Sequence, residues 1–89
     1  MKIVKTASAG TLESSDVYVE VAPQEGGISL EIDSVVYAQF GEAIRRTVLD
    51  VLQECGVENA SVRVADRGAL ECVLRARVET ALLRGKEEG

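Results

Sequence analysis

Two adjacent serines, Ser14 and Ser15, are the hydroxyl pair that this 89-residue sequence places in a loop where chemistry could take place. They lie between Glu13 and Asp16, in a segment that begins at Gly10 and reads Gly-Thr-Leu-Glu-Ser-Ser-Asp. Because this segment is rich in turn-forming residues, we expect an exposed loop whose serine could be modified by another enzyme. A serine pair that simply forms a turn fits the same pattern, and the pattern alone favours that interpretation.

The two acids beside the serines could form an acid–base pair or bind a cation. Glu13 and Asp16 lack the series of oxygen ligands that a calcium-binding loop requires. We therefore expect a solvated loop, with at most an accessory contact to Mg²⁺ or to a basic partner surface.

The absence of histidine excludes several kinds of active site. Ser-His-Asp and Cys-His nucleophiles and imidazole metal ligands all require that residue. The two cysteines, Cys55 and Cys72, cannot complete a structural zinc site by themselves. We expect both thiols to be reduced and buried. Neither GxGxxG nor GxxxxGK[ST] occurs, so we predict no nucleotide-binding glycine loop. Together with the missing histidine and the small number of cysteines, this predicts no catalytic residue and no metal site.

Charge and aromatic content argue against a nucleic-acid ligand. The net charge is −5, which repels a polyanion, and the three aromatic residues are too few for a base-stacking platform. Four arginines flank the apolar stripes of two predicted helices: Arg45, Arg46, Arg75 and Arg77. Their pattern favours a solvated face with paired acids over a contact with phosphate or with a partner carboxylate.

Hydrophobic periodicity supplies the elements that position these residues. Strands are predicted over residues 2–8, 17–22, 28–33 and 60–65, and helices over residues 36–55 and 70–82. The second and third strands follow each other at hairpin distance, so we expect them to pair. Phe40 and Leu70 belong to the predicted inward faces of the helices, and Cys72, beside Val73, is expected to pack in the core.

Helix ends are predicted from capping residues. Asp33 or Ser34 should cap the start of the first helix, and Gly56 should end it. Gly41 indicates that the first turns could form a separate short segment. Gly68 with Glu71 resembles part of a capping box for the second helix.

The order strand, strand, strand, helix, strand, helix predicts the α+β class. We expect a two-layer sandwich with a small, mostly antiparallel sheet and two helices on one face. Residues 1–84 should form a single domain, and residues 85–89 a polar, disordered tail. No apolar run approaches the length of a membrane helix or a signal peptide, so we expect a cytoplasmic chain without membrane contact.

Three segments resemble the acyl carrier protein of citrate lyase, its gamma subunit. They are the segment from Gly10 to Val17, the Leu-Glu-Ile-Asp-Ser segment ending at Ser34 with Gln-Phe-Gly at 39–41, and Asp-Arg-Gly-Ala-Leu-Glu-Cys-Val-Leu-Arg-Ala-Arg at 66–77. The resemblance runs in order from about Gly10 to Arg84. The usual fatty-acid carrier differs, because it has Asp-Ser-Leu at the start of a helix, a motif that this sequence lacks.

The resemblance implies a carrier role without catalysis. It implies a 2'-(5''-phosphoribosyl)-3'-dephospho-CoA group joined by a phosphodiester to Ser14, with the adjacent Ser15 as the alternative. Acetyl and citryl thioesters would be carried on this group while citrate is cleaved to acetate and oxaloacetate. The implied partners are the alpha subunit (acyl transferase), the beta subunit (citryl lyase), a prosthetic-group transferase and a citrate lyase ligase.

Three other functions remain open from the sequence. One is the related carrier subunit of malonate decarboxylase, which uses the same kind of prosthetic group. Another is a small protein-interaction module with an unmodified Ser14. The third is a small RNA-binding domain, which the net charge makes the least favoured.

Overall fold

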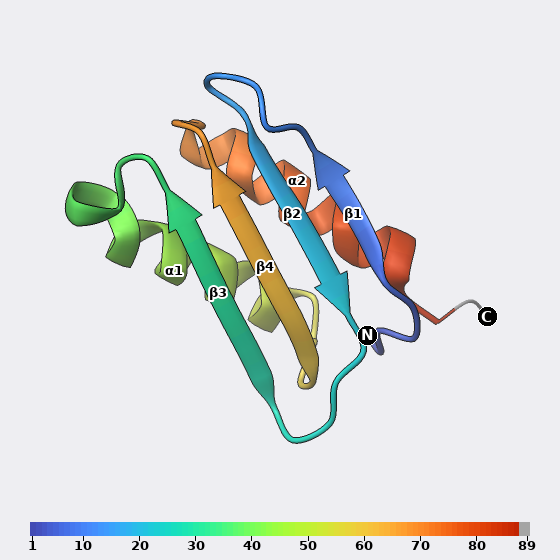
Figure 1. The fold of residues 1–89 in the computed structure, drawn as a ribbon. Coiled ribbons are helices and arrows are strands. Elements are labelled where there is room, and N and C mark those ends of the chain that lie inside the picture. The colour runs from blue at the N-terminus through green and yellow to red at the C-terminus, as the bar shows by residue number, and fades with distance from the viewer. Residues whose placement is uncertain (88–89) are drawn as a thin grey trace.

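The computed structural model describes residues 1–87, which form one four-stranded sheet with both helices packed on the same face (Figure 1). The elements in chain order are β1 Ala7–Gly10, β2 Val17–Ala22, β3 Ile28–Ser34, α1 Tyr37–Glu54, β4 Ala60–Asp66 and α2 Glu71–Gly85. The predicted α+β class and two-layer sandwich are therefore confirmed.

The sheet has the strand order β1-β2-β4-β3, so the predicted hairpin between residues 17–22 and 28–33 is wrong. β2 pairs antiparallel with β1 and with β4, while β3 pairs in parallel with β4. The reason is that α1 follows β3 and carries the chain back along the sheet, as parallel neighbours require. β4 then enters between β2 and β3 and becomes a central strand.

Alternate residues of the central strands build the core under the helices. Val19 and Val21 of β2 and Val62 of β4 are buried, since successive side chains of a strand point to opposite faces. The helices contribute the buried residues Val48, Val51, Leu52, Leu74, Val78, Ala81 and Leu82. Each of the larger side chains contributes about 1.5–3 kcal/mol by leaving water.

The junction from β3 to α1 differs from the predicted cap. α1 follows Val36 without a side-chain cap, so neither Asp33 nor Ser34 acts as expected. Instead, Ser34 Oγ accepts the Val36 N–H at 3.1 Å and donates to Asp66 Oδ2 at 2.8 Å. The predicted end is confirmed, because Gly56 follows the helix with a φ of +68°.

Gly41 does not divide the first helix, since α1 is continuous from Tyr37 to Glu54. A Cβ at position 41 would lie 2.8 Å from the Tyr37 ring, so the missing side chain lets this ring lie against the helix. The separate short segment expected from the glycine is therefore absent.

Two apolar residues expected in the core are exposed. Phe40 is 52% exposed, and the first turn of α1 extends past the edge of the sheet (Figure 1). Leu70 is 70% exposed, because it precedes α2 and its side chain does not follow the helical phase. The capping box does not form either, since Glu71 accepts a hydrogen bond from Thr47 instead.

Cysteine burial also departs from expectation. Both thiols are free, as predicted, but Cys72 is exposed and Cys55 is only half-buried. Cys72 occupies the outer side of the first turn of α2, whereas Leu74 points into the core. The expectation that Cys72 packs inside is therefore wrong.

The two ends of the described chain meet at one end of the sheet. The predicted strand over residues 2–8 is displaced, because β1 begins at Ala7 and Ile3 makes only an isolated bridge with Lys86. Gly85 closes α2 and is buried, so the segment assigned to the tail begins inside the domain. Lys86 bridges Ile3, and the Glu87 N–H donates to the Lys2 carbonyl oxygen at 2.8 Å, whereas residues 88–89 of that expected tail lie outside the described residues. Over residues 1–87, none of the helices combines the length and apolarity needed to cross a membrane.

We expect Leu74→Ala to lower the free energy of unfolding by about 2–5 kcal/mol, as truncation of a buried leucine does. Leu74 is 4% exposed, whereas Leu83 on the same helix is 56% exposed. Leu83→Ala is therefore the matched control, with an expected change within about 0.5 kcal/mol. Urea denaturation of the three proteins measures both values, and equal losses in the two variants would contradict the core assignment.

Candidate modification site

Ser14 and Ser15 occupy the centre of a turn between β1 and β2. The Asp16 N–H donates to the Glu13 carbonyl oxygen at 3.1 Å and closes this turn. Both serines are exposed, as the sequence predicts. Ser15 has a φ of +66°, the left-handed conformation that few residues other than glycine adopt.

The turn is attached to the segment that links β4 to α2. The Ser15 N–H donates to the Arg67 carbonyl oxygen at 2.8 Å, and the Arg67 N–H donates to the Asp16 carbonyl oxygen at 2.9 Å. These bonds continue the antiparallel pairing of β2 with β4 by one further step beyond Val17 and Asp66. The serine turn is therefore held by the sheet on one side, although it is exposed to solvent.

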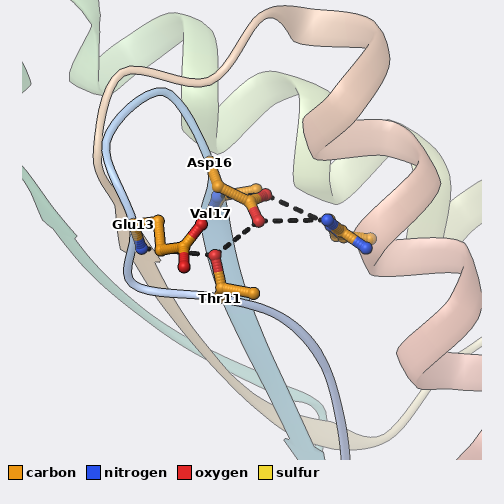
Figure 2. Close-up of polar contacts among 5 residues, drawn as sticks. Thr11, Glu13, Asp16 and Val17 are labelled. Carbon is orange, nitrogen blue, oxygen red and sulfur yellow. Dashed lines mark hydrogen bonds and ion pairs between the residues drawn. The ribbon is translucent and has the colours of Figure 1, made fainter.

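Asp16 joins the serine loop to α2 (Figure 2). Its carboxylate accepts the Thr11 hydroxyl at 2.6 Å, the Val17 N–H at 2.7 Å and two N–H groups of Arg77 at 3.0 and 3.2 Å. The Thr11 hydroxyl oxygen in turn accepts the Glu13 N–H at 3.2 Å. The Thr11 hydrogen bond, followed by those from Val17 and Arg77, lowers the pKa of Asp16 to about 2.

Gly10 permits this close arrangement at the start of the loop. Its φ is +94°, and a Cβ at this position would lie 1.8 Å from the Val17 carbonyl oxygen and 3.2 Å from the Arg77 side chain. No side chain therefore fits between β1, β2 and α2 at this point. Sequence analysis identified Gly10 only as a turn former.

The structure corrects the expectation of a solvated acidic loop. Asp16 is partly buried and fully engaged, whereas Glu13 is exposed. Arg77 pairs with Asp16, and Arg75 pairs with Glu54 at 2.6 Å, so both follow the expected pairing with acids. The hydrogen bonds that Arg75 donates to Glu54 raise the pKa of this guanidinium further.

Sequence analysis missed two participants in this site. Thr11 and the backbone of Arg67 hold the loop, but neither was singled out. Arg77 was singled out, yet its partner lies 61 residues earlier in the chain. The available signal was the Gly-Thr-x-x-x-x-Asp spacing, in which a hydroxyl and a carboxylate flank a short turn.

The arrangement presents a hydroxyl without activating it. An acid with a pKa of about 2 is a poor proton acceptor at neutral pH, and all its bonds to Thr11, Val17 and Arg77 favour the charged form. Asp16 is therefore poorly suited to act as a general base in this loop. Within residues 1–87, no group of three or more histidine, cysteine or acidic side chains could hold a metal ion.

Comparison with known proteins gives this site its context. A family model described as malonate decarboxylase delta subunit matches residues 4–85. A citrate lyase acyl carrier protein from Serratia proteamaculans is 60% identical, over 100% of this chain and 88% of that relative. The chain belongs to the citrate lyase acyl carrier protein family. A second member of the family, citrate lyase acyl carrier protein 2 from Salmonella paratyphi A, is 56% identical over 99% of this chain and 92% of its own length.

Solved structures share the fold of this family member. A chain in a malonate decarboxylase hetero-tetramer from Pseudomonas has a TM-score of 0.65 and 21% identity, covering 92% of this chain and 84% of that chain. A Thermus thermophilus protein has a TM-score of 0.67 and 13% identity, covering 94% of this chain and 16% of its own. At these identities the two structures support the fold alone.

The Asp16 contacts predict a pH-dependent part of the stability. Because the folded pKa of about 2 lies below the ordinary value of 3.8, this contribution is fully present above about pH 4 and is lost as the pH falls through 2. The melting temperature of Asp16→Asn should therefore lie well below that of the wild type at pH 5 and approach it at pH 2. Asp50→Asn, at an exposed position on α1, is the matched control. A difference between Asp16→Asn and wild type that stays constant from pH 5 to pH 2 would contradict the assignment.

Gly10 and Gly26 allow the close approach to be tested separately from backbone strain. Both have positive φ, +94° and +84°, but a Cβ at Gly26 meets no atom within 4 Å. We expect Gly26→Ala to cost roughly 1–2 kcal/mol from the left-handed backbone alone, and Gly10→Ala to cost several times more. Chemical denaturation measures both, and similar values for the two variants would show that the loop relaxes around the added carbon.

Proposed function

We propose that this chain is the acyl carrier subunit of citrate lyase and that Ser14 carries a 2'-(5''-phosphoribosyl)-3'-dephospho-CoA group through a phosphodiester. The observation that carries the proposal is the exposed Ser14 hydroxyl, at the centre of a turn fixed to β4 and α2, in a member of this family. When bound, the group supplies a thiol that holds acetyl and citryl thioesters during cleavage of citrate to acetate and oxaloacetate.

Ser14 is favoured over Ser15 by the backbone of the turn. The Ser15 amide is bonded to Arg67 and its φ is left-handed, so its position is strongly constrained. Ser14 stands one residue further from β4, where a modifying enzyme can surround it. In the attachment reaction the Ser14 hydroxyl loses its proton, its oxygen bonds to the phosphorus of an activated donor, and the bond from that phosphorus to its leaving group breaks.

The residues around Ser14 fit a negatively charged phosphodiester. Arg77 offsets the charge of Asp16, so one of the two flanking acids is neutralised toward an approaching phosphate. Glu13 is exposed and its carboxylate can turn away into solvent. The poor basicity of Asp16 supports a separate transferase that brings its own base.

The proposed partners follow from this carrier role. They are the alpha and beta subunits of citrate lyase, the prosthetic-group transferase and the citrate lyase ligase, all in the cytoplasm. A thiol on a long arm reaches two active sites without being released, because tethering replaces diffusion with a high local concentration. The chain itself positions the arm and takes no catalytic part.

A malonate decarboxylase carrier is the second candidate, because the family model carries that description. Relatives 56–60% identical named for citrate lyase support the first candidate instead. The subunits that co-purify with the chain from its native cells discriminate the two. Co-purification of malonate decarboxylase subunits in place of citrate lyase subunits would favour the malonate decarboxylase carrier over the citrate lyase carrier.

The attachment residue is tested by intact mass and by mapping of the peptide 6–45 from cells that ferment citrate. Ser14→Ala should abolish the added mass and leave the melting temperature unchanged, because the side chain is exposed. Ser15→Gly is the matched control, since it removes the neighbouring hydroxyl at a φ of +66°, which glycine adopts easily. It should load like the wild type. Loading that survives Ser14→Ala and disappears in Ser15→Gly would move the site to Ser15, and an unmodified wild-type chain would refute the carrier function.

A further inference from the structure

An apolar groove of about 370 Å³ lies between the start of α1 and the start of α2. Phe40 and Ile44 of α1 form one wall, and Leu70 and Leu74 form the other. Phe40 and Leu70 are the two apolar residues that the sequence placed in the core and that the structure exposes. Their exposure is therefore concentrated at one groove instead of being scattered over the surface.

The groove begins one residue after the point where the chain binds the serine loop. Arg67 accepts the Ser15 N–H through its carbonyl oxygen, and the groove lining begins at the next residue, Gly68. The serine loop and the β4–α2 connection lie at the same end of the sheet (Figure 1). A group attached to Ser14 thus starts from a loop that is hydrogen-bonded to Arg67, the residue next to the groove lining.

Thr47, Asp66 and Glu71 supply the polar side chains of the groove. Thr47 is buried and donates its hydroxyl hydrogen to Glu71 Oε1 at 3.1 Å, which orients this carboxylate. Among the residues that the structure describes, Glu71 Oε2 accepts no hydrogen bond. Asp66, in contrast, is occupied by Ser34 and by the Ala69 N–H. The groove therefore suits a flat apolar ring that carries an N–H donor, and the charge of Glu71 disfavours a phosphate.

We propose that this groove binds the adenine base of the group attached to Ser14, an inference that rests on the proposed function. In that group the adenosine is joined directly to the phosphoribosyl unit that starts at the phosphodiester, and adenine is its only aromatic ring. A cavity of roughly 150 Å³ accommodates benzene, so about 370 Å³ has room for a purine. Phe40 offers its ring for stacking, and Glu71 accepts a hydrogen bond from the 6-amino group.

Binding of the base divides the arm into two parts. The phosphoribosyl and adenosine parts lie along the domain, between Ser14 and the groove. The diphosphate and the thiol-bearing chain would then be left outside the groove, where the charge of Glu71 does not oppose them. The carrier then presents a shorter, more directed arm than one that is free from the serine onward.

The test compares amide NMR spectra of the ¹⁵N-labelled chain with and without the group, after intact mass has established loading. Loading should shift the amide resonances of Phe40, Thr47 and Leu70 as well as those of residues 11–16. Leu70→Ser should abolish the shifts at Phe40 and Thr47. Leu83→Ser should retain them, because it makes the same exchange at an exposed position on α2 outside the groove.

Free nucleotides test the same groove without the tether. Titration of the unloaded chain with adenosine monophosphate should shift the same groove resonances, and inosine monophosphate, which lacks the amino group, should shift them less. If loading of the group shifts only the amide resonances of residues 11–16, the inference about the groove is overturned and the proposed function stays intact. A wild-type chain whose mass shows no group on Ser14 would overturn the proposed function, and the inference with it.

Discussion

The site depends on one carboxylate that connects three separate parts of the chain. Asp16 binds Thr11 at the start of the loop, the first amide of β2, and Arg77 on α2. Without it, the loop would be held only by its backbone bonds to Arg67. Because the loop is exposed, this engagement is what gives a surface serine a fixed position relative to the sheet and helix.

The arrangement separates the presentation of a hydroxyl from its activation. A nucleophilic serine needs a base to activate it, whereas here the Asp16 carboxylate is kept ionised by its own contacts. Under the proposed function a carrier benefits from this separation, because an unreactive serine stays intact until a modifying enzyme acts on it. The thiol chemistry proposed for the group needs neither Cys55 nor Cys72, and both of these thiols are free.

Periodicity predicted the elements, while contacts between distant residues decided how they meet. The alternation of valines in β2 and β4 identified both strands, and the two helices were found within a few residues of their ends. The pairing of β3 with β4 could not be predicted from the alternation of apolar and polar residues, because this alternation does not indicate which strands are neighbours in the sheet. The exposed loop with Ser14 followed from its composition, but the Asp16–Arg77 contact joins residues 61 positions apart and left no local signal. Phe40 was misplaced because the first turn of α1 extends past the edge of the sheet, and Leu70 because it precedes α2 and does not follow its helical phase.

The position of β4 has a consequence for the order in which the molecule can be assembled during synthesis. β4 is a central strand of the sheet and is the last of the four strands to leave the ribosome. β3 therefore has no sheet neighbour until β4 appears. α2 follows later still, and with it Arg77 reaches Asp16. A nascent chain therefore displays Ser14 on an unsecured loop, and only a finished domain offers it in the geometry described above. A modifying enzyme that reads this geometry would select completed carriers over growing ones.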